Sequence, residues 1–163
     1  MKFMIILGID PGTARIGYAL LDKKDNSKVD LITYGCLELP NKTQTERLAE
    51  ISRLVSDLIS KYHPKMLAVE KLFFTKNVKT ALAVSEARGV IINCANSLNL
   101  DILEFTPLEV KVATTGYGRA EKKEIQKMVC RLLNLEKIPS PDDAADAIAI
   151  GLTACYTNQK LKI

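Results

Sequence analysis

The sequence has few of the residues that build a zinc site. Its 163 residues include one histidine, His63, and four widely spaced cysteines without a C-x-x-C pair: Cys36, Cys94, Cys130 and Cys155. Structural zinc sites need closely spaced cysteine and histidine ligands. Bound zinc is therefore disfavoured, and we expect the cysteines to be reduced thiols.

Long apolar runs are also missing. No stretch reaches the ~20 residues that a membrane helix needs, and the apolar run at residues 3–9 continues into a patterned strand, not a cleavage site. We therefore expect no membrane association and a cytoplasmic location. The chain also lacks repeats, low-complexity tracts and linkers, and its composition (47% hydrophobic, 26% charged) is ordinary for a globular protein. This predicts one domain over residues 1–163.

Basic residues are concentrated in two clusters, although the net charge is only +4. The first cluster consists of Lys111, Arg119, Lys122, Lys123, Lys127 and Arg131. The same stretch contains only two acidic residues, Glu121 and Glu124. The second surrounds the lone acid Glu70 and consists of Lys61, Lys65, Lys71, Lys76 and Lys79. Either cluster alone fits a solvated helix face, but the two together favour a nucleic-acid partner.

The apolar pattern predicts an α/β fold. Residues 3–10 form a buried strand, and residues 15–22 and 28–39 form hairpin arms. Helices are predicted from the capping box of Thr43 and Glu46 to His63, over 75–96, over 119–133, and from an N-cap at Ser140 onward. Strands at 65–70 and 101–105 alternate with these helices. The order predicts a mixed sheet, antiparallel in its first part and parallel in its second.

Two buried strands end on a carboxylate, Asp10 and Glu70. Ligands gather at the carboxyl ends of the strands in such sheets, so both acids are candidates for a site. The last helix adds Asp143 and Asp146, which are spaced to share one helix face. Asp142 fits a first-turn acid that complements the helix dipole.

A cluster of four carboxylates needs a neutralising cation. Without one, mutual repulsion would keep several of them protonated. Oxygen ligands suit Mg²⁺, and two such ions ~4 Å apart can hold the attacking and leaving oxygens of a phosphodiester. The acids and the basic clusters together predict a metal-dependent site that acts on nucleic acid.

The chain resembles the RuvC family of crossover junction endodeoxyribonucleases, the bacterial Holliday junction resolvases. The resemblance is carried in order, from about residue 4 to 156, by "GIDPGT" with Gly17, "AVEKLFFTKN", "EARGV", "GRAEK" and "DDAADAIAI". It implies a ribonuclease-H-like fold with a five-stranded mixed sheet flanked by helices, and a homodimer that nicks two strands of a four-way DNA junction symmetrically during recombination and repair.

The resemblance also implies roles for single residues. Asp10, Glu70, Asp143 and Asp146 match the catalytic metal-binding acids, with Mg²⁺ as the cofactor, two ions per site, and Mn²⁺ able to substitute. The products would carry 5′-phosphate and 3′-hydroxyl ends. The residues implied in DNA binding are Phe73, Lys76, Lys111, Arg119, Lys122 and Lys123. Open questions are whether Asp142 replaces Asp143, the cleavage sequence, and docking to a branch-migration motor.

Three other functions compete with this one. A nuclease of the same fold acting on RNA or an RNA–DNA hybrid would use the same acids, but "KLFFTKN" favours junctions. An actin- or sugar-kinase-type ATP-binding domain also has a "D-x-G-T" loop, but the chain lacks the second glycine-rich phosphate loop that such proteins need. A junction-binding module without activity would gain nothing from carboxylates that face phosphates.

Overall fold

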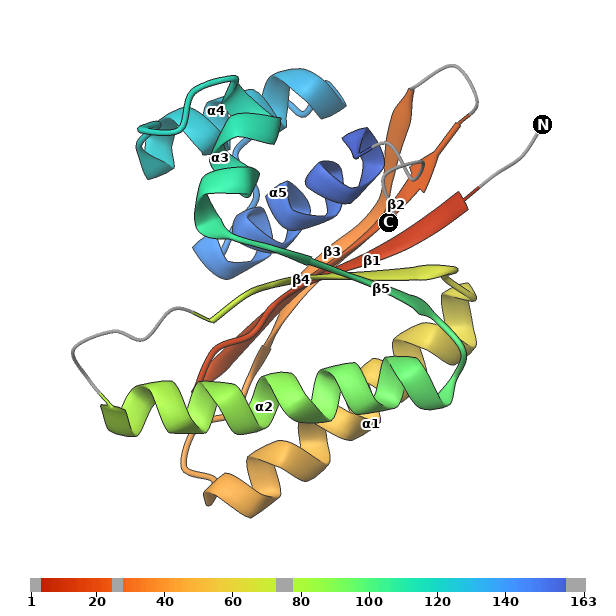
Figure 1. Cartoon of the computed structure of the whole chain (residues 1–163), viewed down its shortest axis with the longest axis vertical. Coiled ribbons are helices and arrows are strands. Elements are labelled where there is room, and N and C mark those ends of the chain that lie inside the picture. The colour runs from red at the N-terminus through yellow and green to blue at the C-terminus, as the bar shows by residue number, and fades with distance from the viewer. Residues whose placement is uncertain (1–3, 25–27, 73–77, 158–163) are drawn as a thin grey trace.

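Five strands form the central sheet of the computed structural model, which describes residues 4–24, 28–72 and 78–157. The strand order is β3-β2-β1-β4-β5 (Figure 1). The strands are β1 (Met4–Asp10), β2 (Arg15–Lys23), β3 (Val29–Glu38), β4 (Met66–Glu70) and β5 (Asp101–Phe105). β1, β2 and β3 pair antiparallel, whereas β1, β4 and β5 are parallel. The predicted five-stranded mixed sheet is therefore confirmed.

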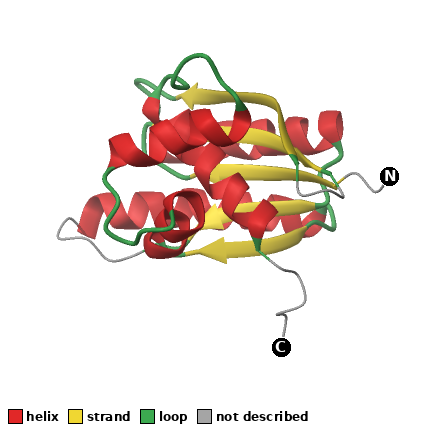
Figure 2. Ribbon diagram, turned by 90° about the horizontal axis from the view of Figure 1, so that it is seen from above, coloured by secondary structure: helices red, strands yellow, loops and turns green. Residues whose placement is uncertain are grey.

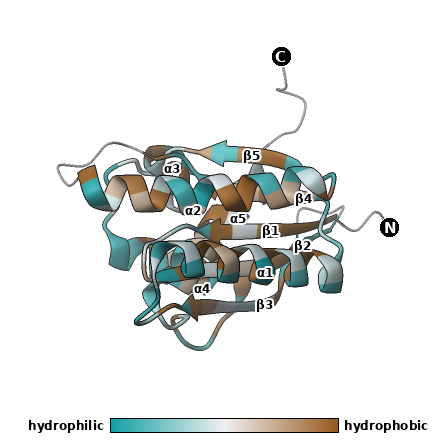
Figure 3. Ribbon diagram, turned by 90° about the horizontal axis from the view of Figure 1, so that it is seen from below, coloured by the Kyte–Doolittle hydropathy of each residue, from teal (hydrophilic) through white to brown (hydrophobic). Residues whose placement is uncertain are grey.

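Helices cover both faces of this sheet. α1 (Gln44–Tyr62) and α2 (Val78–Ser97) lie against one face, and α3 (Pro107–Thr115), α4 (Lys122–Leu133) and α5 (Asp142–Tyr156) lie on the other (Figures 1 and 2). Figure 3 shows β1 hydrophobic along most of its length, whereas α1 and α2 carry hydrophilic residues as well. Among the described residues, no helix is long and apolar enough for a membrane span.

Alternation along the strands decides which face each side chain reaches. In β1, Ile6 packs into the core beneath α5, whereas Leu7 and Ile9 pack into the core beneath α1 and α2. Successive strand residues point to opposite faces, so Asp10 points to the α5 face. β4 follows the same pattern, with Met66 and Ala68 on the α5 side. Glu70 therefore points the same way as Asp10.

Two glycines let α5 approach the sheet closely. A Cβ on Gly8 would lie 2.4 Å from the carbonyl oxygen of Ala147, and a Cβ on Gly17 would lie 1.9 Å from that of Asp143. Gly17 is also the antiparallel partner of Asp10. The absence of a side chain at Gly17 thus brings the N-terminus of α5 next to the end of β1.

The helix ends confirm most of the sequence predictions. Thr43 and Glu46 form the predicted capping box of α1, and His63 ends the helix in the left-handed region at φ 50°. The prediction that Ser140 caps α5 is wrong. Pro141 has an extended backbone (φ −71°, ψ 175°) and occupies the N-cap, so Asp142 is the first helical residue. Asp142 and Asp143 do lie in the first turn, as expected.

α3 lies outside the helices predicted from the sequence. This helix begins with a capping box between Thr106 and Glu109, with Pro107 in its first turn. The Thr106 N–H donates to Glu109 at 2.6 Å, and the Glu109 N–H donates to the Thr106 hydroxyl at 3.1 Å. The spacing T-P-L-E is a recognisable start signal. The helix matters because it carries Lys111.

Candidate active site

Four carboxylates converge where the carboxyl ends of β1 and β4 meet the first two turns of α5. Asp10 and Glu70 end two neighbouring parallel strands and face α5. Asp143 and Asp146 come from that helix, and both act on Asp10 through their charges, as Glu70 does. The structure therefore brings together the four acids that the sequence analysis selected.

Asp10 lies at the centre of this cluster. Burial raises its pKa from 3.8 to about 8, and the negative charges of Asp146, Glu70 and Asp143 act in the same direction. Lys122 opposes this shift only in part. In the absence of other cations, Asp10 therefore holds a proton at neutral pH, because a further negative charge there is unfavourable.

Two other acids of the cluster are shifted in the same direction. Burial, followed by the charge of Asp146, raises the pKa of Glu70. Burial also raises the pKa of Asp146; hydrogen bonding and the positive charge of Lys122 lower it, and Asp143 and Asp142 raise it further. Burial is thus the main cause of the raised pKa values of Asp10, Glu70 and Asp146, and neighbouring carboxylates add to it. Acids shifted together in this way are candidates for a functional site.

Lys122 supplies positive charge to this cluster from the first residue of α4. Its Nζ lies 3.1 Å from Oδ2 of Asp146 and 3.3 Å from Oδ2 of Asp142. Burial lowers the pKa of Lys122, but the hydrogen bonds and charges of the two aspartates outweigh burial and raise it. The side chain is half exposed, so it can also reach a bound anion.

Asp142 and Asp143 have different surroundings although they are adjacent. Asp142 is 66% exposed, and it accepts a hydrogen bond of 3.1 Å from Nε2 of the buried Gln126. Asp143 is 31% exposed and lies 3.9 Å from the guanidinium of Arg15. Of these two aspartates, only Asp143 contributes to the raised pKa of Asp10.

A cavity of about 240 Å³ opens beside the acids. Its polar residues are Glu70, Lys111, Lys122 and Asp146, and its apolar lining includes Val110 and Ile150. Lys111 projects from α3, the helix that the sequence analysis did not predict. The lining of the cavity thus combines two carboxylates, two lysines and apolar side chains.

The other residues predicted to contact DNA do not line this cavity or lie outside the described residues. Arg119 and Lys123 are exposed on either side of the start of α4. Phe73 and Lys76 lie outside the described residues. Sequence reasoning missed Arg15 and Gln126, which contact Asp143 and Asp142, because those pairs join positions that are far apart along the chain.

The side chains of the site are suited to a hard divalent cation, although they are not arranged as a complete set of metal ligands. Within residues 4–24, 28–72 and 78–157, no group of three acidic, histidine or cysteine side chains is arranged to hold a metal. The clustered donors are carboxylate oxygens, which Mg²⁺, Mn²⁺ and Ca²⁺ prefer over nitrogen or sulfur. Lys122 is the one cation of the described residues that opposes the raised pKa of Asp10, so a further cation held among these oxygens would favour their ionised forms.

The fold and this acidic site define a class of nuclease. A five-stranded mixed sheet flanked by helices is the architecture of the ribonuclease-H-like fold. Comparison with known proteins identifies the family within this class. The family model described as "Crossover junction endodeoxyribonuclease RuvC" matches residues 6–154. The chain belongs to this family.

Individual relatives agree with this assignment. The chain is 51% identical over 156 residues to the crossover junction endodeoxyribonuclease RuvC of Halothermothrix orenii, covering 95% of this chain and 93% of that protein. The Thermus thermophilus RuvC structure matches with a TM-score of 0.86 at 31% identity, covering 94% of this chain and 95% of that one. T. thermophilus RuvC in complex with a Holliday junction substrate matches with a TM-score of 0.87 at 32% identity, covering 92% of each chain. The predicted family, fold and enzyme class are confirmed.

Proposed function

We propose that this protein is a structure-specific endonuclease that resolves four-way DNA junctions by symmetric, metal-dependent hydrolysis of phosphodiester bonds. The observation that carries the proposal is the convergence of Asp10, Glu70, Asp143 and Asp146 next to Lys122, in a member of the RuvC family. A relative of the same fold and 32% identity forms a complex with a Holliday junction substrate. The products would be nicked duplexes with 5′-phosphate ends.

The four acids are the proposed metal ligands. The family resemblance implies Mg²⁺, two ions per site, with Mn²⁺ able to substitute, and the carboxylate oxygens suit hard divalent cations of this kind. Divalent cations held there would activate water and stabilise the charge that develops on the phosphate. We favour Asp143 over Asp142 as the first metal ligand on α5. The charge of Asp143 raises the pKa of Asp10, whereas Asp142 forms an ion pair with Lys122 and accepts a hydrogen bond from Gln126.

Lys122 would stabilise negative charge on the phosphate. Its ammonium group already lies among the carboxylates, at 3.1 Å from Asp146. A preorganised cation in a partly buried site is worth more than the same charge in water. Lys111, on the wall of the same cavity, would bind the adjacent phosphate.

Other contacts with the junction would come from residues around the cavity. Arg119 and Lys123 are exposed next to Lys122 and are suited to contacts with the DNA backbone. Phe73 is proposed to stack on an unpaired base near the crossover, since aromatic rings bind bases with little sequence demand. Lys76 would bind a phosphate near the same loop.

The proposed active form is a homodimer of one nuclease domain per chain. A two-fold symmetric substrate cut at two equivalent positions suits a two-fold symmetric enzyme. The family resemblance raises docking to a branch-migration motor as an open question, and location in the cytoplasm stays a prediction from the lack of long apolar runs in the sequence.

A substrate comparison tests this function against its alternative. The protein is mixed with Mg²⁺ and either a four-way junction, a matched DNA duplex or an RNA–DNA hybrid, and its mass is measured by analytical ultracentrifugation. We expect paired nicks in the junction alone and a dimer in solution. Cleavage of the hybrid instead would assign an RNA substrate, and single unpaired nicks by a monomer would contradict the symmetric mechanism.

A further inference from the structure

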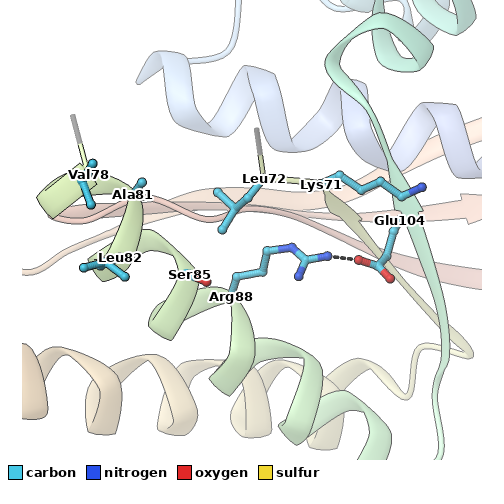
Figure 4. A pocket seen from close by; sticks show the side chains of 8 residues that line it. All are labelled: Lys71, Leu72, Val78, Ala81, Leu82, Ser85, Arg88 and Glu104. Atoms are coloured by element: carbon cyan, nitrogen blue, oxygen red, sulfur yellow. Dashed lines mark ion pairs between the residues drawn. The ribbon is translucent and has the colours of Figure 1, made fainter. Parts of the chain in front are cut away.

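Arg88 is a residue of α2 whose side chain contacts the ends of β4 and β5, next to the backbone of the proposed metal ligand Glu70. Its Nε donates to the backbone carbonyl oxygen of Glu70 at 3.0 Å. Its terminal nitrogen forms an ion pair with the Glu104 carboxylate of β5 (Figure 4). The Arg88 side chain thus contacts both β4 and β5 near their carboxyl ends, where the proposed active site lies.

These contacts fix one particular peptide group. The Glu70 carbonyl belongs to the same peptide as the Lys71 N–H, and that N–H donates to the carbonyl oxygen of Phe105 at 2.7 Å. Arg88 holds one end of this planar unit and β5 holds the other. A peptide group is rigid, so its orientation determines ψ of Glu70 and limits the directions that the Glu70 side chain can take.

The surroundings of Arg88 make this arrangement specific. The arginine side chain is only 18% exposed, and burial lowers its pKa. It lies at the polar end of a cavity of about 440 Å³, whose other end is lined by Val78, Ala81 and Leu82 (Figure 4). Desolvating a guanidinium is unfavourable unless its donors are used. The Glu70 carbonyl and the Glu104 carboxylate are the acceptors that it uses.

We propose that Arg88 is a positioning residue for metal binding: by holding the Glu70–Lys71 peptide it directs the Glu70 carboxylate toward Asp10 and Asp146. This inference rests on the proposed function, because it takes Glu70 as a metal ligand. Replacing a residue that hydrogen-bonds to a metal ligand commonly weakens metal affinity by about 10- to 100-fold. Arg88 differs from such partners in acting on the backbone of the ligand and not on its side chain.

The test compares the wild-type protein with Arg88→Met and Glu104→Gln, and with Arg53→Met as a control. Arg53 also forms ion pairs with two acids, Glu50 and Asp57, but on the exposed face of α1. The measurements are Mn²⁺ affinity by calorimetry, junction affinity without metal, thermal stability, and hydrogen exchange of the Lys71 amide by NMR.

We expect Arg88→Met to weaken Mn²⁺ binding about tenfold or more and to speed exchange of the Lys71 amide, with junction affinity within about twofold of wild type. Glu104→Gln should show a smaller change in the same direction, since Arg88 keeps its bond to the Glu70 carbonyl. Arg53→Met should match the wild type in Mn²⁺ affinity. If Arg88→Met does not fold, Arg88→Lys serves in its place, because one ammonium group cannot satisfy both acceptors in the same geometry.

Unchanged Mn²⁺ affinity in a folded Arg88 variant would overturn the proposal, even if its thermal stability fell, because that result would assign Arg88 a purely structural role. Normal Lys71 exchange would overturn it as well. Failure of the proposed function would differ, since the wild-type protein itself would then bind no Mn²⁺ and cut no junction.

Discussion

The Lys122 ammonium group forms an ion pair of 3.1 Å with the Asp146 carboxylate, from a position 24 residues away in the sequence. This pair connects the start of α4 to the second turn of α5. The Lys122 side chain also lines the cavity that Glu70 and Lys111 line.

Replacing Lys122 should therefore affect catalysis more than binding. We expect Lys122→Met to lower the rate of junction cleavage by about 10²- to 10³-fold, as the loss of one preorganised charge-stabilising group does in other enzymes. Junction affinity should fall little, because many basic residues share the contact with phosphates. Single-turnover cleavage and gel-shift titration of the same preparation separate the two effects. Equal losses in both would mean that Lys122 only binds DNA.

Asp10 should make the stability of the metal-free protein depend on pH. The unfolded chain releases the Asp10 proton near pH 3.8, whereas the folded protein keeps it until about pH 8. Between these values the folded state binds more protons, so the contribution of Asp10 to the free energy of unfolding falls as the pH rises. Asp10→Asn lacks this titration. Its advantage over wild type should grow from about pH 4 to about pH 8 and reach several kcal/mol, since each pKa unit is worth about 1.4 kcal/mol.

Denaturant unfolding of both proteins in a chelator, at about pH 5 and about pH 8, measures this difference. The comparison between the two proteins cancels the other titrating groups that they share. A constant difference across this pH range would show that Asp10 is ionised normally in the folded protein.

Metal binding at neutral pH should release a proton. Asp10 is mostly protonated at about pH 7 without metal, because its pKa is about 8, and a carboxylate must lose its proton to ligate an ion. Calorimetric titration with Mn²⁺ in two buffers of different ionisation enthalpy gives the number of protons released. We expect the wild type to release about one proton more per site than Asp10→Asn at about pH 7, and this difference to fall toward zero at about pH 9.

Gly17→Ala should separate α5 from the end of β1. The added Cβ would lie 1.9 Å from the carbonyl oxygen of Asp143, so the helix N-terminus must shift. We expect a loss of about 1–3 kcal/mol in the free energy of unfolding, typical of overpacking, and a larger relative loss of cleavage because Asp143 and Asp146 move from Asp10.

Gly89→Ala is the matched control for this change. A Cβ at Gly89, within α2, meets no described atom within 4 Å, so the substitution should stabilise the helix by up to about 1 kcal/mol. A Gly17→Ala variant with wild-type stability and activity would contradict the close approach of α5 to β2.

The sequence predicts the acids of this site better than their partners. Asp10 and Glu70 can be found because each ends a buried strand, and alternation then assigns both to one face of the sheet. Asp143 and Asp146 follow from helical spacing. The pairs of Lys122 with Asp142 and of Arg88 with Glu104 join side chains on different elements. Their contact depends on how the helices pack, which no local pattern contains.

Local signals also had limits at the helix ends. The capping box of Thr43 and Glu46 predicts the start of α1, and the equivalent box of Thr106 and Glu109 marks the start of α3, which is absent from the predicted helices. Ser140 was assigned as a cap because serine favours that position, but the extended backbone of Pro141 delays the helix by one residue. The error leaves the acids in the first turns of α5 and does not change the site.

Cleavage of a labelled, mobile four-way DNA junction tests the central claim most directly. Wild-type protein and Asp10→Asn are incubated with the junction in Mg²⁺, in Mn²⁺ and in a chelator, and junction binding is measured in parallel. The account predicts paired, symmetric nicks by the wild-type protein with either metal, and none in the chelator or with Asp10→Asn, while both proteins bind the junction. Undiminished cleavage by Asp10→Asn, or cleavage in the chelator, would show that the four carboxylates are not the metal-dependent active site.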